Sequence, residues 1–166
     1  MNEQEKRKLR VCFTGHRPEN LGMSEIKARS CLSKEIIKSI GEGFKIFITG
    51  MARGVDMWAA EIILSLKENY PELKLIAAVP YEGVEQKWSP KNKELYHRLL
   101  SKADWVIYIC PKFSYSSYQM RNQWMVDHSS KVIAVWNGKK SGTKNTIDYA
   151  IKCGVKVINV YQIESN

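Results

Sequence analysis

The fold of this chain is indicated most clearly by the stretch Ile46-Phe47-Ile48-Thr49-Gly50-Met51-Ala52-Arg53-Gly54-Val55-Asp56. A short apolar run stops at Thr49-Gly50, a tight loop with two glycines follows, and a helical pattern begins near Asp56. A strand, a glycine turn and a helix N-terminus in this order direct unpaired backbone N–H groups and the positive end of a helix dipole at one point. The stretch therefore predicts an anion site, most often one for phosphate.

Similar apolar, partly β-branched runs occur on both sides of this stretch, with segments of helical spacing between them. The alternation of strand and helix predicts an α/β protein with a Rossmann-like three-layer fold. We expect a mostly parallel sheet of about six strands with helices on both faces. We expect one domain over residues 9–160, with flexible tails over residues 1–8 and 162–166. The predicted strands are 9–14, 45–49, 73–79, 105–110, 132–136 and 155–160, and the predicted helices are 24–40, 55–69, 91–102, 117–129 and 143–153.

The composition of the 166 residues, with 44% hydrophobic and 26% charged residues, is typical of a globular protein. No run approaches the roughly 18 apolar residues of a membrane span, and the polar N-terminus lacks the apolar core of a secretion signal. We therefore expect a cytoplasmic protein with no membrane partner. The net charge of +9 suits a polyanionic or phosphorylated partner, but the lysines are scattered. Nucleic acid is therefore an alternative partner that is not favoured, and homo-oligomerisation stays open.

The C-terminal ends of parallel strands lie along one edge of the sheet, where doubly wound folds bind their ligands. Polar and glycine residues just beyond those ends are therefore candidate ligand-binding residues. Arginines in such loops can bind a phosphate through two parallel hydrogen bonds, and a tyrosine can stack on a base. The candidates are Thr14, Gly15, His16, Arg17, Gly50, Arg53, Gly54, Asp56, Tyr81, Arg121, Ser141, Gly142 and Thr143. For Asp56, a helix cap and an acceptor for a ligand hydroxyl, such as that of a ribose, are equally good interpretations.

No set of residues in the sequence indicates a catalyst. The weak candidates are the carboxylates near the predicted edge, Asp56, Glu82 and Asp127, which could steady positive charge on a sugar or activate water. The loop at 50–56 is neither GxGxxG nor a Walker loop, so hydrolysis of ATP by a P-loop mechanism is not expected. The four cysteines have no spacing that fits zinc, so we expect no metal and no required cofactor, and a nucleotide-like ligand is a candidate only.

Five motifs together resemble those of the YpsA-like family of small bacterial proteins. That family is similar to the wider SLOG superfamily, which groups the DprA/Smf proteins with the LOG phosphoribohydrolases. The resemblance covers residues 9–160 and implies a Rossmann-like fold that binds a nucleotide or a nucleotide-derived ligand, such as NAD or an ADP-ribose derivative. The motifs are Thr14-Gly15-His16-Arg17-Pro18, the stretch from Thr49 to Asp56, Ala103-Asp104-Trp105-Val106, the stretch from Arg121 to Asp127, and Ser141-Gly142-Thr143.

The resemblance implies phosphate binding more than catalysis. Ser141-Gly142-Thr143 lies where LOG proteins carry Pro-Gly-Gly-x-Gly-Thr followed by a catalytic glutamate, and here Lys144, Asn145 and Thr146 follow instead. We therefore expect a binding module or sensor for a phosphorylated, nucleotide-like ligand. The alternatives are a hydrolase that cleaves an N-glycosidic or phosphoester bond of such a ligand, and a nucleic-acid-binding protein.

Overall fold

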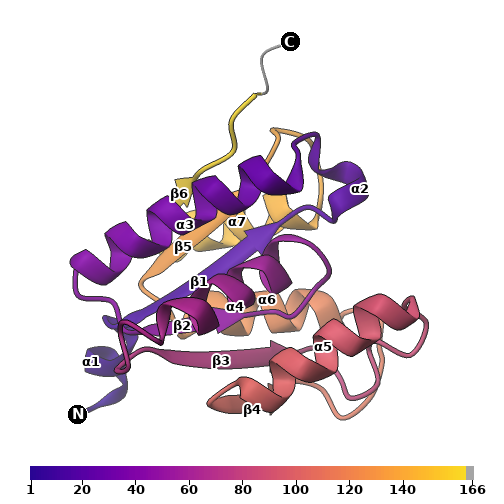
Figure 1. Cartoon of the computed structure of the whole chain (residues 1–166), viewed down its shortest axis with the longest axis horizontal. Helices are drawn as coiled ribbons and strands as arrows, with labels where there is room; N and C mark the ends of the chain where they lie inside the picture. Colours follow the sequence, from indigo (N-terminus) through magenta and orange to yellow (C-terminus); the bar gives the residue numbers. More distant parts are fainter. Residues whose placement is uncertain (164–166) are drawn as a thin grey trace.

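The structure is a computed structural model that describes residues 1–163. Its centre is a six-stranded parallel sheet in the order β4-β3-β2-β1-β5-β6 (Figure 1). The predicted α/β fold class is confirmed, and every predicted strand and helix is present. The strands are β1 (Arg10–Gly15), β2 (Ile46–Thr49), β3 (Lys74–Val79), β4 (Trp105–Tyr108), β5 (Lys131–Val135) and β6 (Lys156–Asn159), and the long helices are α3 (Glu25–Gly41), α4 (Val55–Leu66), α5 (Pro90–Lys102), α6 (Ser117–Asp127) and α7 (Gly142–Lys152).

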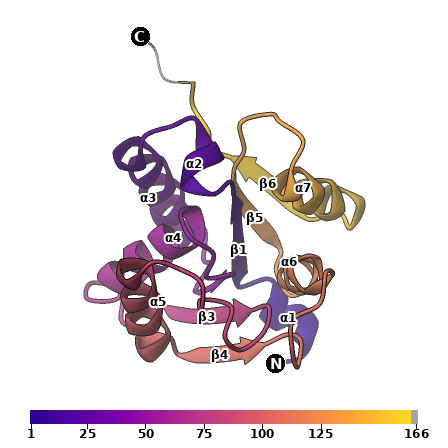
Figure 2. The same ribbon diagram turned by 90° about the vertical axis from the view of Figure 1, so that its right-hand side faces the viewer.

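Helices cover both faces of the sheet. α3, α4 and α5 lie on one face, and α6 and α7 lie together on the other (Figure 2). Each face has its own apolar core: Phe47 and Ile63 are fully buried in the larger one, and Ile48 and Val132 are fully buried in the smaller one. The central strands are therefore covered on both sides, which explains why their sequences are continuous apolar runs. In the part of the chain that the structure describes, no helix has both the length and the apolar character required to span a membrane.

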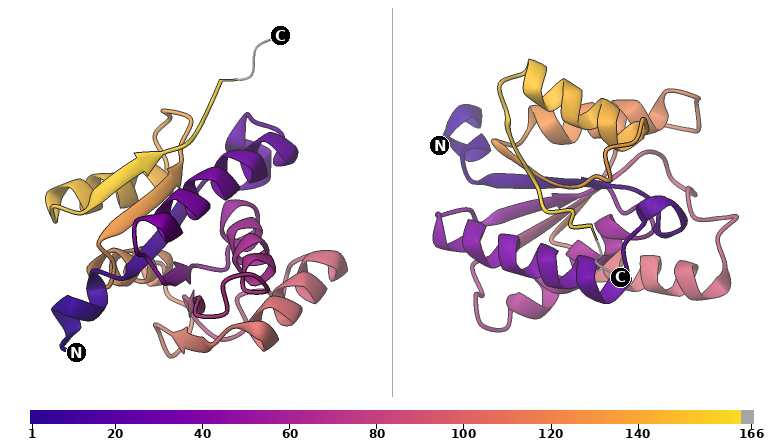
Figure 3. Two further views of the ribbon diagram at one scale, coloured as in Figure 1. Left: turned by 60° about the vertical axis from the view of Figure 1, so that its left-hand side comes forward. Right: turned by 90° about the horizontal axis from the view of Figure 1, so that it is seen from above.

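The strand order reverses between β1 and β5. β1 to β4 follow one another toward one side of the sheet, and the chain then crosses through α6 to β5 on the other side of β1. Gly15 at the end of β1 is paired with Val135 at the end of β5, so the loops that follow these two strands begin at the same level (Figure 3). Such a switch point is where open α/β sheets bind ligands.

Two short helices were not predicted. Within the N-terminal tail expected over residues 1–8, Glu3–Arg7 forms α1, with reciprocal hydrogen bonds between Asn2 and Glu5 at its start. Arg7 Nε ties this helix to the domain by donating to the carbonyl of Ser129 at 2.9 Å. Pro18–Leu21 forms α2 just after β1. Of the C-terminal tail expected over residues 162–166, residues 164–166 lie outside the described part of the chain.

Candidate functional site

A cavity of about 260 Å³ lies at the C-terminal edge of the sheet, at the switch point between β1 and β5. Its walls come from the end of β1 and the following loop, the start of α4, the first half of α6 and the start of α7. The structure thus brings together most of the predicted ligand-binding residues, although they lie far apart in the sequence. Its lining residues are Phe13, Thr14, Gly15, His16, Arg17, Asn20, Ala52, Asp56, Tyr118, Arg121, Asn122, Ser141, Gly142 and Thr143.

Gly15 allows α4 to start directly against the end of β1. A Cβ atom at this position would lie 2.4 Å from Cγ2 of Val55, the first residue of α4, which is closer than real Cβ contacts. The missing side chain therefore permits the close packing of strand and helix that forms the floor of the cavity. Thr14, one residue earlier, is 7% exposed and lines the same cavity.

Asp56 does not cap α4, because the N-cap residue is Gly54 and Asp56 is the second residue of the helix. Its Oδ2 instead accepts a hydrogen bond from the N–H of Ala52 at 3.3 Å, across the loop. Its carbonyl oxygen accepts a second hydrogen bond from Thr49 Oγ1 at 2.8 Å. These contacts fix the loop after β2 and hold the carboxylate against the cavity, so the helix-cap interpretation is wrong and the ligand-contact interpretation stays a prediction.

Arg121 reaches the cavity from α6 and is 4% exposed. Its Nη1 donates to the carbonyl of Gly50, and its Nε donates to Asn122 Oδ1 at 2.8 Å. A Cβ atom on Gly50 would lie 2.7 Å from Asp56 Oδ2 and 2.8 Å from Arg121 Nη1. Gly50 is therefore a residue behind the cavity wall, where only glycine leaves space for both buried charged groups.

Burial acts on the two buried charges in opposite directions. It raises the pKa of Asp56, an effect that the positive charge of Arg121 partly offsets. It lowers the pKa of Arg121, an effect that the negative charge of Asp56 partly offsets. The charge of Arg17 also reaches both groups, since it favours the ionised form of Asp56 and disfavours that of Arg121. One carboxylate among two arginines leaves an excess of positive charge along the cavity, which suits an anion.

His16 lines the cavity as a neutral ring. The N–H of Asn137 donates to His16 Nε2 at 3.2 Å, so the ring proton of the neutral form lies on Nδ1. Burial lowers the pKa of His16 below its ordinary value. The ring is thus available as a hydrogen-bond donor at neutral pH, held in place by the loop after β5.

Several donors at the cavity have no protein partner within residues 1–163. The guanidinium of Arg17 forms no hydrogen bond or ion pair there, and neither do the hydroxyls of Thr14 and Thr143, although both threonines are buried. α7 begins with Ser141 Oγ accepting from the N–H of Lys144 at 3.2 Å, while the N–H groups of Gly142 and Thr143 have no acceptor in the same range. Buried polar groups normally have partners, so this convergence of donors indicates a site for an acceptor-rich group.

Besides Gly50, two predicted residues from the loop after β2 lie outside the cavity. Arg53 extends to α2, where its Nη2 and Nη1 donate to the carboxylate of Glu19 at 2.8 and 3.4 Å. Gly54 has φ of 90° and packs against Pro18, whose Cδ would be 2.8 Å from an added Cβ. The expectation that Arg53 lines the same cavity as Arg17 is therefore wrong, because a carboxylate of α2 draws its side chain to the other side of the loop.

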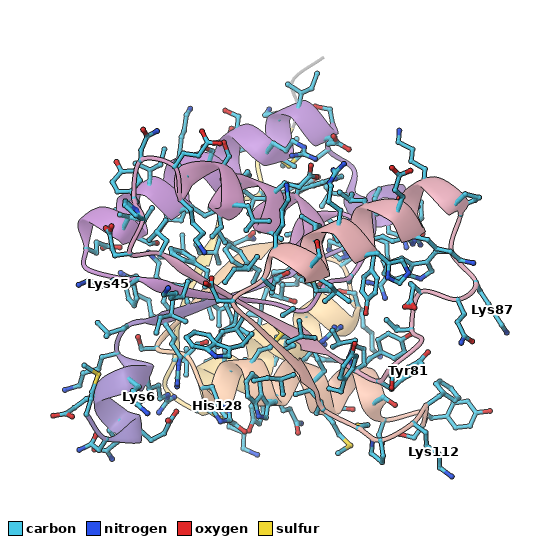
Figure 4. The ribbon with its side chains drawn as sticks, turned by 60° about the horizontal axis from the view of Figure 1, so that its bottom comes forward. Lys6, Lys45, Tyr81, Lys87, Lys112 and His128 are labelled. Atoms are coloured by element: carbon cyan, nitrogen blue, oxygen red, sulfur yellow. The ribbon has the colours of Figure 1, made fainter. Side chains whose placement is uncertain are left out.

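The other predicted residues outside the cavity lie beyond β3 and on α6. Tyr81 packs its ring at 5.6 Å from that of Phe113, beside the segment that carries Lys112 (Figure 4). Glu82 is exposed, and exposed Asp127 accepts a hydrogen bond from the hydroxyl of Tyr149 at 2.7 Å. Of the three candidate catalytic carboxylates, only Asp56 lines the cavity.

Five lining residues were not predicted from the sequence, namely Phe13, Asn20, Ala52, Tyr118 and Asn122. A signal was present for two of them, because Tyr118 lies three residues before Arg121 and four before Asn122, and these spacings place neighbours on one helix face. Asn20 belongs to α2, which the sequence did not predict. No group of three or more His, Cys, Asp or Glu side chains in residues 1–163 is arranged to hold a metal ion.

The sequence and the fold both match known proteins. A family model for YpsA, described as the YspA SLOG family, matches residues 11–164. The chain belongs to this family. It is 37% identical over 118 residues to the uncharacterised SPbeta prophage-derived protein YoqJ of Bacillus subtilis, which covers 64% of this chain and 69% of YoqJ. A UPF0398 protein of Bacillus cereus is 30% identical over 154 residues, 87% of this chain and 83% of the relative.

Among solved structures, this member of the YpsA family is similar to two DprA proteins. The DNA processing protein A of Streptococcus pneumoniae superposes with a TM-score of 0.65 at 19% identity, over 94% of this chain and 51% of that one. The protein from Helicobacter pylori, described for its single-stranded DNA binding mode, superposes with a TM-score of 0.61 at 19% identity, over 93% of this chain and 66% of that one. The chain thus spans about half of the pneumococcal protein, and the similarity confirms the Rossmann-like fold.

Proposed function

We propose that this protein binds a phosphorylated nucleotide or nucleotide-derived ligand in the cavity at the switch point, as a sensor or binding module. The observation that supports this proposal most strongly is the convergence of hydrogen-bond donors that have no protein acceptor within residues 1–163. These donors are the guanidinium of Arg17, the hydroxyls of Thr14 and Thr143, and the first N–H groups of α7. A phosphate offers several acceptor oxygens and negative charge, and the start of a helix favours both. The excess of positive charge at the cavity agrees with this ligand class.

The direct test is isothermal titration of the folded protein with inorganic phosphate, AMP, NAD and ADP-ribose. We expect at least one phosphorylated compound to bind, and the unphosphorylated nucleoside adenosine to bind far more weakly than AMP. A site variant for the same titration is Thr143→Val, which keeps the shape of the side chain, removes its hydroxyl and should weaken AMP binding. An absence of binding across this panel, with the protein folded by circular dichroism, would argue strongly against the proposal.

A hydrolase that cleaves an N-glycosidic or phosphoester bond of the same ligand is the second candidate. Asp56 favours it, since this carboxylate lines the cavity and its burial raises its pKa, as is common for groups that transfer protons. Incubation with AMP and NAD, followed by chromatography, would reveal free base or nicotinamide. Turnover that persists in Asp56→Asn would exclude Asp56 as the acting carboxylate.

Nucleic-acid binding is the third candidate, favoured by the net charge of +9 and by the fold shared with a protein described for binding single-stranded DNA. The positive charge is nevertheless dispersed: in Figure 4, Lys6 and Lys45 lie toward one side of the molecule and Lys87 and Lys112 toward the opposite side. A phosphate-backbone interface would produce affinity that falls steeply with salt. Affinity for a short oligonucleotide that is independent of salt would exclude this candidate.

A further inference from the structure

A second cavity of about 280 Å³ adjoins the first, between α6 and α7. The two cavities share Tyr118, Asn122 and Gly142 in their walls, so they are neighbours at the start of α7. α6 and α7 lie side by side on the same face of the sheet (Figure 2). The second cavity is therefore close enough to receive another part of a ligand whose phosphate is bound in the first.

The chemistry of the second cavity differs from that of the first. None of its lining residues is charged, whereas the first contains two arginines and an aspartate. Three tyrosines line it, Tyr115, Tyr118 and Tyr149. Such rings offer flat faces on which a planar heterocycle can stack.

Two of these rings are held in position by their neighbours. Tyr118 packs edge-on against Tyr81, with ring centroids 6.1 Å apart, and lies 5.9 Å from the guanidinium carbon of Arg121. Tyr149 donates from its hydroxyl to Asp127 Oδ1 at 2.7 Å. Binding a planar group would therefore cost little ordering of these side chains.

The remaining polar lining consists mainly of carboxamides, which are contributed by Gln119, Asn122, Gln123 and Asn145. Asn122 Oδ1 accepts from Arg121, but the amide groups of the other three form no hydrogen bond to another residue within the described part of the chain. A carboxamide carries both a donor and an acceptor, so it matches the mixed donor and acceptor edge of a nucleobase. It has no charge with which to favour an ionic group.

We propose that this second cavity is the site for the base of a nucleotide whose phosphate lies in the first cavity. The inference rests on the proposed function and adds to it the place of the base, between α6 and α7, and the requirement for a neutral heterocyclic base, which a sugar phosphate lacks. The same chemistry could be supplied by a free mononucleotide or by one residue of a single strand. A free mononucleotide agrees better with the dispersed surface charge.

The test compares ribose 5-phosphate, AMP and a short oligodeoxyadenylate by isothermal titration with the full chain. We expect AMP to bind about 10-fold or more tightly than ribose 5-phosphate, because stacking and hydrogen bonding of the base are added. In the double variant Gln119→Ala/Asn145→Ala, we expect AMP affinity to fall by about 5-fold or more and that of ribose 5-phosphate to stay unchanged. Both side chains are exposed on helices, so folding should be preserved. Asn69→Ala, an exposed asparagine outside both cavities, is the control.

The outcomes distinguish phosphate binding in the first cavity from base binding in the second. Equal binding of AMP and ribose 5-phosphate would overturn the base site and leave phosphate binding intact. No binding of either would overturn the proposed function and the base site together. An oligodeoxyadenylate that binds more tightly than AMP, and loses affinity in the double variant, would support the base site and assign it to a single strand.

Discussion

Two arginines from neighbouring loops provide the sharpest test of how this protein binds an anion. Arg17 lines the cavity and has no hydrogen bond or ion pair within residues 1–163, while Arg53 is held by Glu19 at 2.8 Å outside it. Replacing each by alanine removes the same charge and the same number of donors. We therefore expect different consequences from two substitutions that look equivalent in the sequence.

Arg17→Ala should weaken AMP binding by about 10- to 150-fold, since a hydrogen bond to a charged group contributes about 1.5–3 kcal/mol. Its effect on the free energy of unfolding should stay within about 0.5 kcal/mol, because no protein contact of its guanidinium is lost. Arg53→Ala should leave the affinity unchanged and destabilise the fold by about 0.2–1 kcal/mol, as expected for an exposed ion pair.

Isothermal titration gives the affinities, and urea unfolding gives the stabilities. Comparable loss of affinity in both variants would show that AMP binding depends on the overall positive charge near this edge and not on the position of Arg17 in the cavity. Loss of affinity in Arg53→Ala alone would refute the placement of the phosphate at Arg17. If Arg17→Ala lowered the free energy of unfolding by as much as it weakened AMP binding, Arg17 would have a structural role instead.

Three further substitutions test other parts of the site. Gly50→Ala should destabilise the fold by about 1–3 kcal/mol in urea unfolding, because its Cβ would lie 2.7 Å from Asp56 Oδ2 and 2.8 Å from Arg121 Nη1. Thr143→Val should reduce AMP affinity about 2- to 12-fold, with little change in stability, since it removes one hydroxyl donor. Burial lowers the pKa of His16, so the unfolded chain binds its proton more readily, and stability should fall as pH drops below about 6.5. In His16→Gln this part of the pH dependence should disappear.

Each of these expectations has a result that would contradict it. A Gly50→Ala variant as stable as the wild type would mean that the buried charge pair can move apart. Unchanged AMP affinity in Thr143→Val would remove the start of α7 from the binding site. Parallel stability curves of wild type and His16→Gln between pH 5 and 7 would show that other groups set the acid sensitivity.

The sequence predicted the layers of the fold because each strand and long helix has its own periodic pattern of apolar residues. Continuous runs such as Leu73–Val79 are characteristic of strands that are buried on both faces, and the structure places β3 there. The short helices α1 and α2 escaped prediction because five and four residues are too few to display helical periodicity. Their positions are set by capping and by contacts with distant residues, such as that between Arg7 and Ser129.

The loops of the site were predicted better than the directions of their side chains. Parallel topology alone brings the residues after β1 and before α7 to one edge, so Thr14 and Thr143 could be placed together from the sequence. The direction of Arg53 depends on Glu19, which belongs to the unpredicted α2. Tyr81 was favoured as the stacking residue, but it packs behind Tyr118, and that arrangement follows only from the three-dimensional packing of α6.

The most direct test of the central claim is a crystal structure of the protein soaked with AMP. We expect the phosphate within hydrogen-bond distance of the N–H groups of Gly142 and Thr143 and of the guanidinium of Arg17, with the base between α6 and α7. A phosphate bound at Arg53 and Glu19, or an AMP molecule that leaves the cavity at the switch point unfilled, would contradict it.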